Sequence, residues 1–155
     1  LLQSVDVIMP WAVGRYNNSS YKIASDIIKR DISWCNQKGV DYVPLVFPGF
    51  SWGNLQKNTS KYNEIPRNEG NFLWNQIASA KNAGAKMLYV AMFDEVDEGT
   101  AIFKCLRENE VPLNADRKFV GIENNLDNDY YLWLTGQAAK WFHGDAGYGT
   151  AKPVR

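Results

Sequence analysis

Met87-Leu88-Tyr89-Val90-Ala91-Met92-Phe93 is an apolar run that stops at four carboxylates within five positions, Asp94, Glu95, Asp97 and Glu98, the acid cluster. The run has the length and the β-branched and aromatic content of a buried strand. Gly99 follows the acid cluster and permits a tight change of direction. Because parallel α/β folds place their chemistry at the carboxyl ends of strands, this stretch predicts a fold class and the position of a site together.

Strands and helices alternate along the rest of the chain. The predicted strands cover residues 5–9, 41–47, 87–93 and, more weakly, 118–123. The predicted helices cover residues 21–38, 71–83, 129–143 and a short segment at 99–106. Alternating elements with continuous apolar strands are typical of a parallel sheet covered on both faces. We expect the tail after Gly144 to be disordered or loosely packed.

Composition limits the class of partner. The 155 residues suffice for one core, and 17 basic residues balance 17 acidic ones, so no net field attracts nucleic acid or an acidic membrane. No apolar run approaches the roughly 20 residues that cross a bilayer. We therefore expect no nucleic acid and no membrane partner. Cys35 and Cys105 form either one bridge or, as we favour, two buried thiols.

No motif in the sequence predicts a bound cofactor. No glycine fingerprint follows the first predicted strand, which argues against a bound dinucleotide. His143 is the only histidine and lies near the chain end, which argues against a histidine-based triad or zinc site. We predict that the protein holds neither a cofactor nor a metal.

Crowded carboxylates repel one another, and this repulsion raises the pKa of at least one of them. One carboxyl group then stays protonated as a proton donor beside another that is ionised and serves as a base. Glu95 and Glu98 are the candidate pair. Two other interpretations remain. The acid cluster could be a solvated turn at a helix N-terminus, or a set of hard oxygen ligands for Ca²⁺, although the spacing does not fit an EF-hand loop.

The loops after the other predicted strands carry aromatic residues and arginines. In a parallel fold these loops gather on the face that also holds the acid cluster. Aromatic rings that stack on sugars, arginines and paired acids together indicate a sugar-binding site. For Trp11 and Trp52, both stacking on a sugar and packing in the core remain open. For Arg15 and Arg67, both sugar binding and pairing with the acids remain open. The candidate substrate-binding residues are Trp11, Arg15, Tyr16, Phe50, Trp52, Arg67 and Asp94.

The remaining tryptophans lie on apolar faces of the predicted helices, so we expect them in the core. They are Trp34, Trp74, Trp133 and Trp141.

The segment Phe93-Asp94-Glu95-Val96-Asp97-Glu98-Gly99-Thr100 resembles the Phe-Asn-Glu-Trp-x-Glu-Gly-Thr motif of the family 99 glycoside hydrolases, the endo-α-mannosidases and endomannanases, and of related family 71/99-like proteins. The resemblance continues through segments 9–15, 46–52 and 63–67 and covers about residues 4–143. Asp94 replaces the motif's Asn, and Val96 replaces its Trp.

The resemblance implies the C-terminal portion, about half, of a (β/α)8 barrel over residues 1–144, with a tail at 145–155. It also implies a retaining glycosidase that acts on α-linked glycans such as mannan. In such an enzyme Glu95 acts as base on the sugar 2-hydroxyl, which gives a 1,2-anhydro intermediate, and Glu98 acts as general acid and then base.

A non-catalytic, lectin-like protein on the same fold is the alternative. In either case we expect an oligosaccharide or polysaccharide partner and an extracellular or periplasmic location. Because half a barrel exposes apolar strand edges, we also expect self-association or pairing with a missing N-terminal half.

Overall fold

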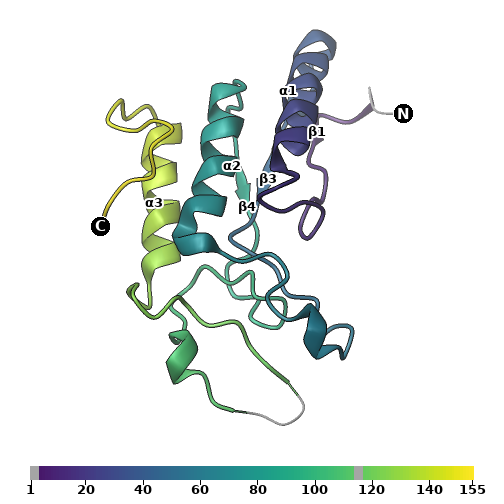
Figure 1. Ribbon diagram of the computed structural model, residues 1–155. Coiled ribbons are helices and arrows are strands. Elements are labelled where there is room, and N and C mark those ends of the chain that lie inside the picture. Colours follow the sequence, from purple (N-terminus) through teal and green to yellow (C-terminus); the bar gives the residue numbers. More distant parts are fainter. Residues whose placement is uncertain (1–3, 114–116) are drawn as a thin grey trace.

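The computed structural model describes residues 4–113 and 117–155. Its strands are short: β1 Val7–Ile8, β2 Asp41–Tyr42, β3 Leu45–Val46 and β4 Tyr89–Val90. Helices α1, α2 and α3 span Tyr21–Lys38, Asn71–Asn82 and Tyr130–Phe142, and the 3-10 helices η2, η3 and η4 span Thr59–Lys61, Asn68–Gly70 and Glu108–Glu110. Figure 1 shows α1, α2 and α3 side by side, with the long loops gathered at one end of the strands.

The strands pair in parallel, as the alternating pattern predicts. β1 pairs with β2, and β3 pairs with β4 in the register Leu45 to Tyr89. The predicted strand at 41–47 is divided at Pro44, which has no N–H to donate. The N–H of Val43 donates to the carbonyl of Ile8 at 2.9 Å, and the carbonyl of Pro44 accepts from the N–H of Tyr89 at 3.0 Å. One extended segment therefore joins β1 on one side to β4 on the other.

Two predicted elements are wrong. Residues 99–106 form no helix, because the N–H groups of Ile102 and Phe103 donate back to the carbonyl of Phe93. Residues 118–123 form no strand beside β4. Their contact is a single parallel bridge between Arg107 and Ile122, and a Cβ on Gly121 would lie 2.5 Å from the backbone of Glu108. The close approach of this glycine to η4 replaces the expected strand pairing.

Helix α1 has its predicted bounds because a left-handed glycine ends it. Gly39 has φ 68°, and its N–H and that of Val40 donate to carbonyls in the last turn of α1. Ile32 and Cys35 bury one side of the helix, while Trp34 is 37% exposed, which corrects its predicted place in the core. Neither Cys35 nor Cys105 is bridged; Cys35 is buried, as we expect of both thiols, but Cys105 is only half-buried.

The core centres on α2. Four of its side chains are fully buried: Phe72, Leu73, Trp74 and Ile77. Trp74 stacks on Trp141 of α3 with ring centroids 5.7 Å apart, and half-buried Trp133 packs against the same core. Burial of each large apolar side chain contributes roughly 1.5–3 kcal/mol relative to exposure. The core assignment of Trp74, Trp133 and Trp141 is confirmed.

A buried glutamine lies between α2 and the end of β3. Gln76 is 1% exposed, and its Nε2 donates to the carbonyls of Phe47 at 2.8 Å and Phe72 at 2.9 Å. Its Oε1 accepts from the hydroxyl of Tyr16 and the N–H of Phe47. All four hydrogen-bonding capacities of this amide are used, so its burial carries no unpaired polar group.

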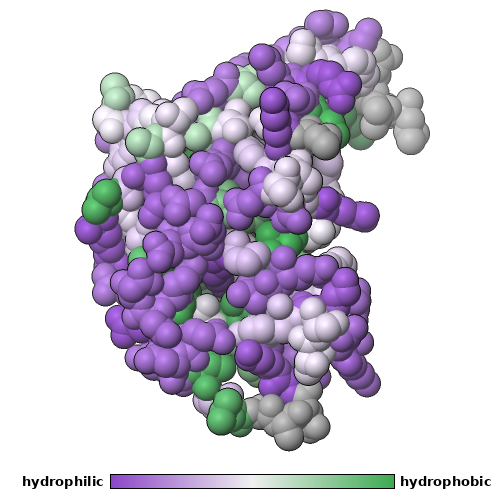
Figure 2. Space-filling view, viewed as in Figure 1, coloured by the Kyte–Doolittle hydropathy of each residue, from purple (hydrophilic) through white to green (hydrophobic). Residues whose placement is uncertain are grey.

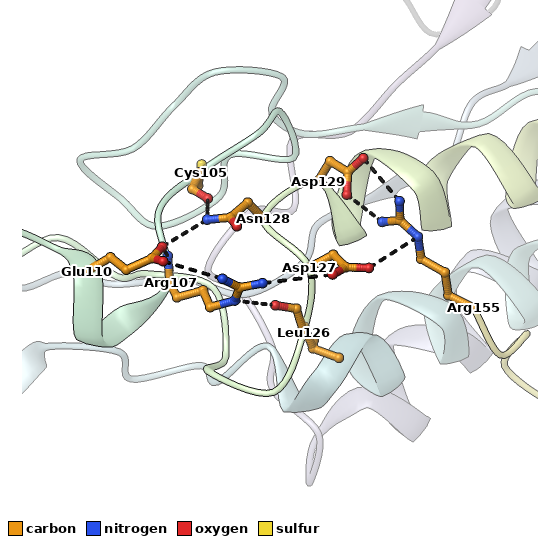
Figure 3. Close-up of polar contacts among 8 residues, drawn as sticks. All are labelled: Cys105, Arg107, Glu110, Leu126, Asp127, Asn128, Asp129 and Arg155. Atoms are coloured by element: carbon orange, nitrogen blue, oxygen red, sulfur yellow. Dashed lines mark hydrogen bonds and ion pairs between the residues drawn. The ribbon is translucent and has the colours of Figure 1, made fainter.

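The C-terminal tail is packed, contrary to our expectation. The carbonyl of Gly149 accepts from Nε1 of Trp74 at 3.1 Å, and Nζ of Lys152 donates to the hydroxyl of Tyr130 at 2.6 Å. Arg155 pairs with Asp129 and Asp127 near the start of α3. Figure 3 shows that Asp127 lies between Arg155 and Arg107, whose Nε donates to the carbonyl of Leu126 at 2.7 Å. These contacts join the tail to α2, α3 and the loop before α3.

Apolar side chains at alternate positions of β1, β4 and their flanks are left uncovered. They are Val5, Val7, Met9, Trp11, Met87, Tyr89 and Phe93, each at least 40% exposed. Leu88, just before β4, and Val90 of β4 pack instead against the core. The rings of Trp11 and Tyr89 are 6.5 Å apart, so the two sets meet and form the uncovered face. The face of the molecule in Figure 2 is mostly hydrophilic, with scattered hydrophobic side chains. No described helix is long and apolar enough to cross a membrane.

Candidate active site

The acid cluster lies in a closed turn after β4. The N–H of Thr100 donates to the carbonyl of Glu95 at 3.1 Å, and the N–H of Met92 donates to the carbonyl of Thr100 at 3.2 Å. Gly99 has φ 68°, and a Cβ there would lie 3.0 Å from Val120. Both the left-handed backbone and the lack of space require a glycine. The turn thus holds the acid cluster at the carboxyl end of a parallel strand, as the sequence predicts.

Glu98 has the environment of a proton donor. Its carboxyl group is partly desolvated, and this burial raises its pKa above the ordinary value; the nearby carboxylates of Glu95 and Asp97 raise it further. Its backbone carbonyl accepts from the N–H of Ser51 at 2.7 Å, which ties the acid cluster to the loop after β3. Glu98 therefore stays protonated to higher pH than an exposed glutamate.

Glu95 is held by its own turn. One oxygen of its carboxylate, Oε1, accepts from the N–H of Asp97 at 2.7 Å, and its backbone carbonyl also accepts from Oγ1 of Thr100 at 3.3 Å. Glu95 lies close enough to Glu98 for its carboxylate to raise the pKa of Glu98.

The other two acids differ from each other. Asp97 accepts at Oδ1 from Nδ2 of Asn54 at 3.2 Å and pairs with Nη1 of Arg117 at 3.3 Å, so it joins three loops. Asp94 is exposed, and no hydrogen bond or ion pair involves its side chain in the part of the chain that the structure describes. Of the acid cluster, Asp94 is therefore the residue most open to a ligand.

Trp11, Arg15 and Trp52 lie at the surface in part or in full. Trp11 is 54% exposed, and Arg15 is exposed in the turn that its N–H closes onto the carbonyl of Ala12. Trp52 is half-buried, with its ring 4.6 Å from that of Phe50. These positions leave apolar or cationic surface that a sugar can contact.

Tyr16 and Phe50 serve the core instead. Tyr16 is 8% exposed, and its hydroxyl donates to Oε1 of Gln76; burial raises the pKa of this hydroxyl well above its usual range. Phe50 is 3% exposed and pairs with Ile65 in an antiparallel bridge. Their positions do not support the predicted substrate contacts.

Arg67 is also buried, at 3% exposure. Its Nη2 donates to the carbonyl of Ala101 at 2.8 Å, and its guanidinium lies 4.5 Å from the ring centroid of Tyr131. Nε and Nη1 have no hydrogen-bond partner among the described residues. Arg67 thus supports the chain just after the acid cluster and does not pair with the acids in this structure.

Three positioning residues were missed by sequence reasoning. Ser51 and Thr100 are fully buried, and each donates to a backbone carbonyl of the acid cluster. Asn54 joins Asp97 to the carbonyl of Lys118 at 3.0 Å. Asn54 gave no signal beyond its place in the loop after a predicted strand, whereas Ser51 and Thr100 belong to segments that resemble family 99.

The described residues offer no metal site. No group of three or more His, Cys, Asp or Glu side chains among residues 4–113 and 117–155 is arranged to hold an ion. The acid cluster therefore does not have the convergent geometry that Ca²⁺ requires.

Comparison with known proteins identifies solved structures that have a similar fold. No protein-family model and no curated protein matches the chain. Two structures of a GH99 endo-α-mannosidase from Bacteroides thetaiotaomicron do match. The complex with bis-tris propane covers 90% of this chain with a TM-score of 0.71, and the other structure covers 93% with a TM-score of 0.70, both at 22% sequence identity.

The chain spans about two fifths of the length of those enzymes, 41% and 40% respectively. At this identity the likeness shows the fold: parallel strands and helices arranged as in part of an endo-α-mannosidase. The sequence resemblance to family 99 is confirmed at that level.

Proposed function

We propose that the natural protein containing this chain is a glycoside hydrolase of α-linked glycans, mannan-like or related, with the acid cluster at its catalytic centre. The observation that carries the proposal is the partly desolvated Glu98 beside Glu95, at the carboxyl end of β4. A carboxyl group with a raised pKa next to an ionised one is the pairing that glycoside hydrolysis uses. The fold shared with an endo-α-mannosidase supports the same chemistry.

The two glutamates have different roles in the proposed reaction. The carboxylate of Glu95 removes the proton of the sugar 2-hydroxyl while that oxygen attacks the anomeric carbon and the glycosidic bond breaks. Glu98 donates its proton to the leaving oxygen. Water then opens the 1,2-anhydro sugar, Glu98 takes a proton from the water, and Glu95 returns its proton to O2. Two displacements at one carbon give net retention.

We also propose that residues 1–144 are the C-terminal part of a (β/α)8 barrel in an extracellular or periplasmic enzyme. The parallel order of β1 to β4 and the uncovered face beside the core support a barrel interior that further strands would line. The partial coverage of the matched enzymes supports a longer natural protein.

The test compares three full-length proteins: wild type, Glu98→Gln and Glu95→Gln. We expect wild type to release reducing sugar from α-linked mannan oligosaccharides and each variant to lose at least about 10²-fold in rate. Glu64→Gln is the matched control, because Glu64 pairs with Lys61 at the surface.

Binding and folding are measured beside activity. Circular dichroism checks that each variant folds, and titration calorimetry measures glycan binding. Equal binding by all proteins with no sugar release from wild type would instead establish the lectin-like alternative.

A further inference from the structure

A cavity of about 840 Å³ lies between the loop after β3 and the segment around η4. Its walls are about half polar and half apolar, and no part of the hydrolytic mechanism uses them. They include Asn54, Lys57, Asn58, Tyr62, Glu108, Arg117 and Lys118. A cavity of this size accommodates a ligand of one or more sugar units.

The walls are cationic although the chain as a whole has no net charge. Among the described residues, Lys57, Arg117 and Lys118 line the cavity against one carboxylate, Glu108. The carboxylate of Glu108 is already engaged: Oε1 accepts from the hydroxyl of Tyr62 at 2.7 Å, and Oε2 accepts from the N–H of Gly121 at 2.8 Å. Glu108 keeps its negative charge and Arg117 is paired with Asp97, so Lys57 and Lys118 are the cations that face a ligand.

One of these cations, Lys118, is held in place. Nζ of Lys118 lies 3.8 Å from the ring centroid of Tyr62, and its backbone N–H donates to Oδ1 of Asn54 at 3.0 Å. Lys57 has φ 50°, an uncommon conformation for a residue with a side chain. No ion pair neutralises Lys57 within residues 4–113 and 117–155. Because the side chain of Lys118 is already held, it loses less entropy when it binds an anion.

The cavity adjoins the acid cluster. Asn54 and Arg117 line the cavity, and both bind Asp97. A glycan whose scissile bond lies at Glu95 and Glu98 can therefore extend past Asp97 into the cavity.

We infer that this cavity is a further glycan subsite, which takes an anionic substituent of the sugar chain, a uronate carboxylate or a sulfate ester, on Lys57 and Lys118. The inference rests on the proposed glycosidase function and specifies its substrate as an acidic glycan.

The test is titration calorimetry on full-length protein carrying Glu98→Gln, so that the glycan is not cleaved. The probes are a neutral α-linked oligosaccharide, the same oligosaccharide with a uronate unit, the same with a sulfate ester, and inorganic sulfate. Lys57→Gln and Lys118→Gln are compared with Lys22→Gln, which removes an exposed charge from α1.

We expect at least one acidic glycan to bind about tenfold more tightly than the neutral one at low ionic strength. Lys57→Gln with Lys118→Gln should abolish this preference, high salt should weaken it, and Lys22→Gln should leave it intact. The probe with the larger gain identifies the anion.

Equal affinity for neutral and acidic glycans would overturn the subsite while leaving the hydrolase standing. Inorganic sulfate that binds as tightly as the sulfated glycan would also overturn it, because the sugar would then contribute nothing. If no glycan binds and wild type cleaves none, the proposed function fails, and the subsite fails with it.

Discussion

Glu98 and Asp97 show how single residues of the acid cluster acquire different roles. Both are carboxylates in one turn, but Asp97 is paired with Arg117 and Asn54 while Glu98 is partly desolvated beside Glu95. Sequence adjacency predicts repulsion among all four acids. The partners from other loops decide which acid is paired and which has a raised pKa.

The raised pKa of Glu98 predicts a pH-dependent contribution to stability. The folded protein binds this proton more tightly than the unfolded chain, whose glutamate has the ordinary pKa of 4.5. The stability that Glu98 contributes is therefore fully present below that value and is lost as pH rises through the folded-state pKa. Glu98→Gln should gain stability relative to wild type as pH rises.

Urea unfolding of both full-length proteins from acidic to neutral pH measures this difference. Asp26→Asn, which removes an exposed carboxylate from α1, controls for net charge. A difference between wild type and Glu98→Gln that does not change with pH would contradict the assignment.

At the scale of elements, local signals set the three long helices but not the strands or the predicted short helix at 99–106. Gly39 ends α1 where the sequence predicts, whereas Pro44 divides a predicted strand and Gly121 directs another segment onto η4. The tail has few apolar residues, so its sequence does not predict that it packs against the core. Trp74 binds the tail through Gly149, and Asp127 and Asp129 bind Arg155.

Removal of residues 147–155 should destabilise the core. The truncation leaves the buried indole N–H of Trp74 without its partner and removes the ring of Tyr148 from the same core cluster. An unsatisfied buried donor alone costs about 1–3 kcal/mol, so we expect a loss of roughly 2 kcal/mol or more by urea unfolding.

Arg155→Gln is the milder comparison, because its ion pairs are partly exposed and surface pairs contribute about 0–1 kcal/mol. If the truncated protein is as stable as the intact one, the tail does not support α2 and α3.

At the scale of the whole molecule, the main feature is the uncovered face, whose apolar side chains are exposed to solvent. Val7, Trp11 and Tyr89 are 49%, 54% and 40% exposed beside a well-packed core. Clustered exposed apolar side chains next to open strand edges favour association. A longer barrel or a second copy would cover them.

Expressed alone, residues 1–155 should therefore self-associate, and light scattering should give a mass well above 17.6 kDa. Val7→Lys with Tyr89→Lys should reduce the association, because charges on the uncovered face oppose it. Val154→Lys is the control, since Val154 is 94% exposed in the tail. A monodisperse wild-type monomer would contradict this prediction.

The sequence by itself determined the alternation of parallel strands and helices, the bounds of α1 and the position of the acid cluster after β4. These features depend on local periodicity, glycine conformation and the end of one apolar run. Only the tertiary structure decided that Tyr16, Phe50 and Arg67 are buried, that Gln76 closes a polar network, and that cations face a cavity beside Asp97. Burial and charge at those positions depend on residues far apart in the chain, which no local pattern specifies.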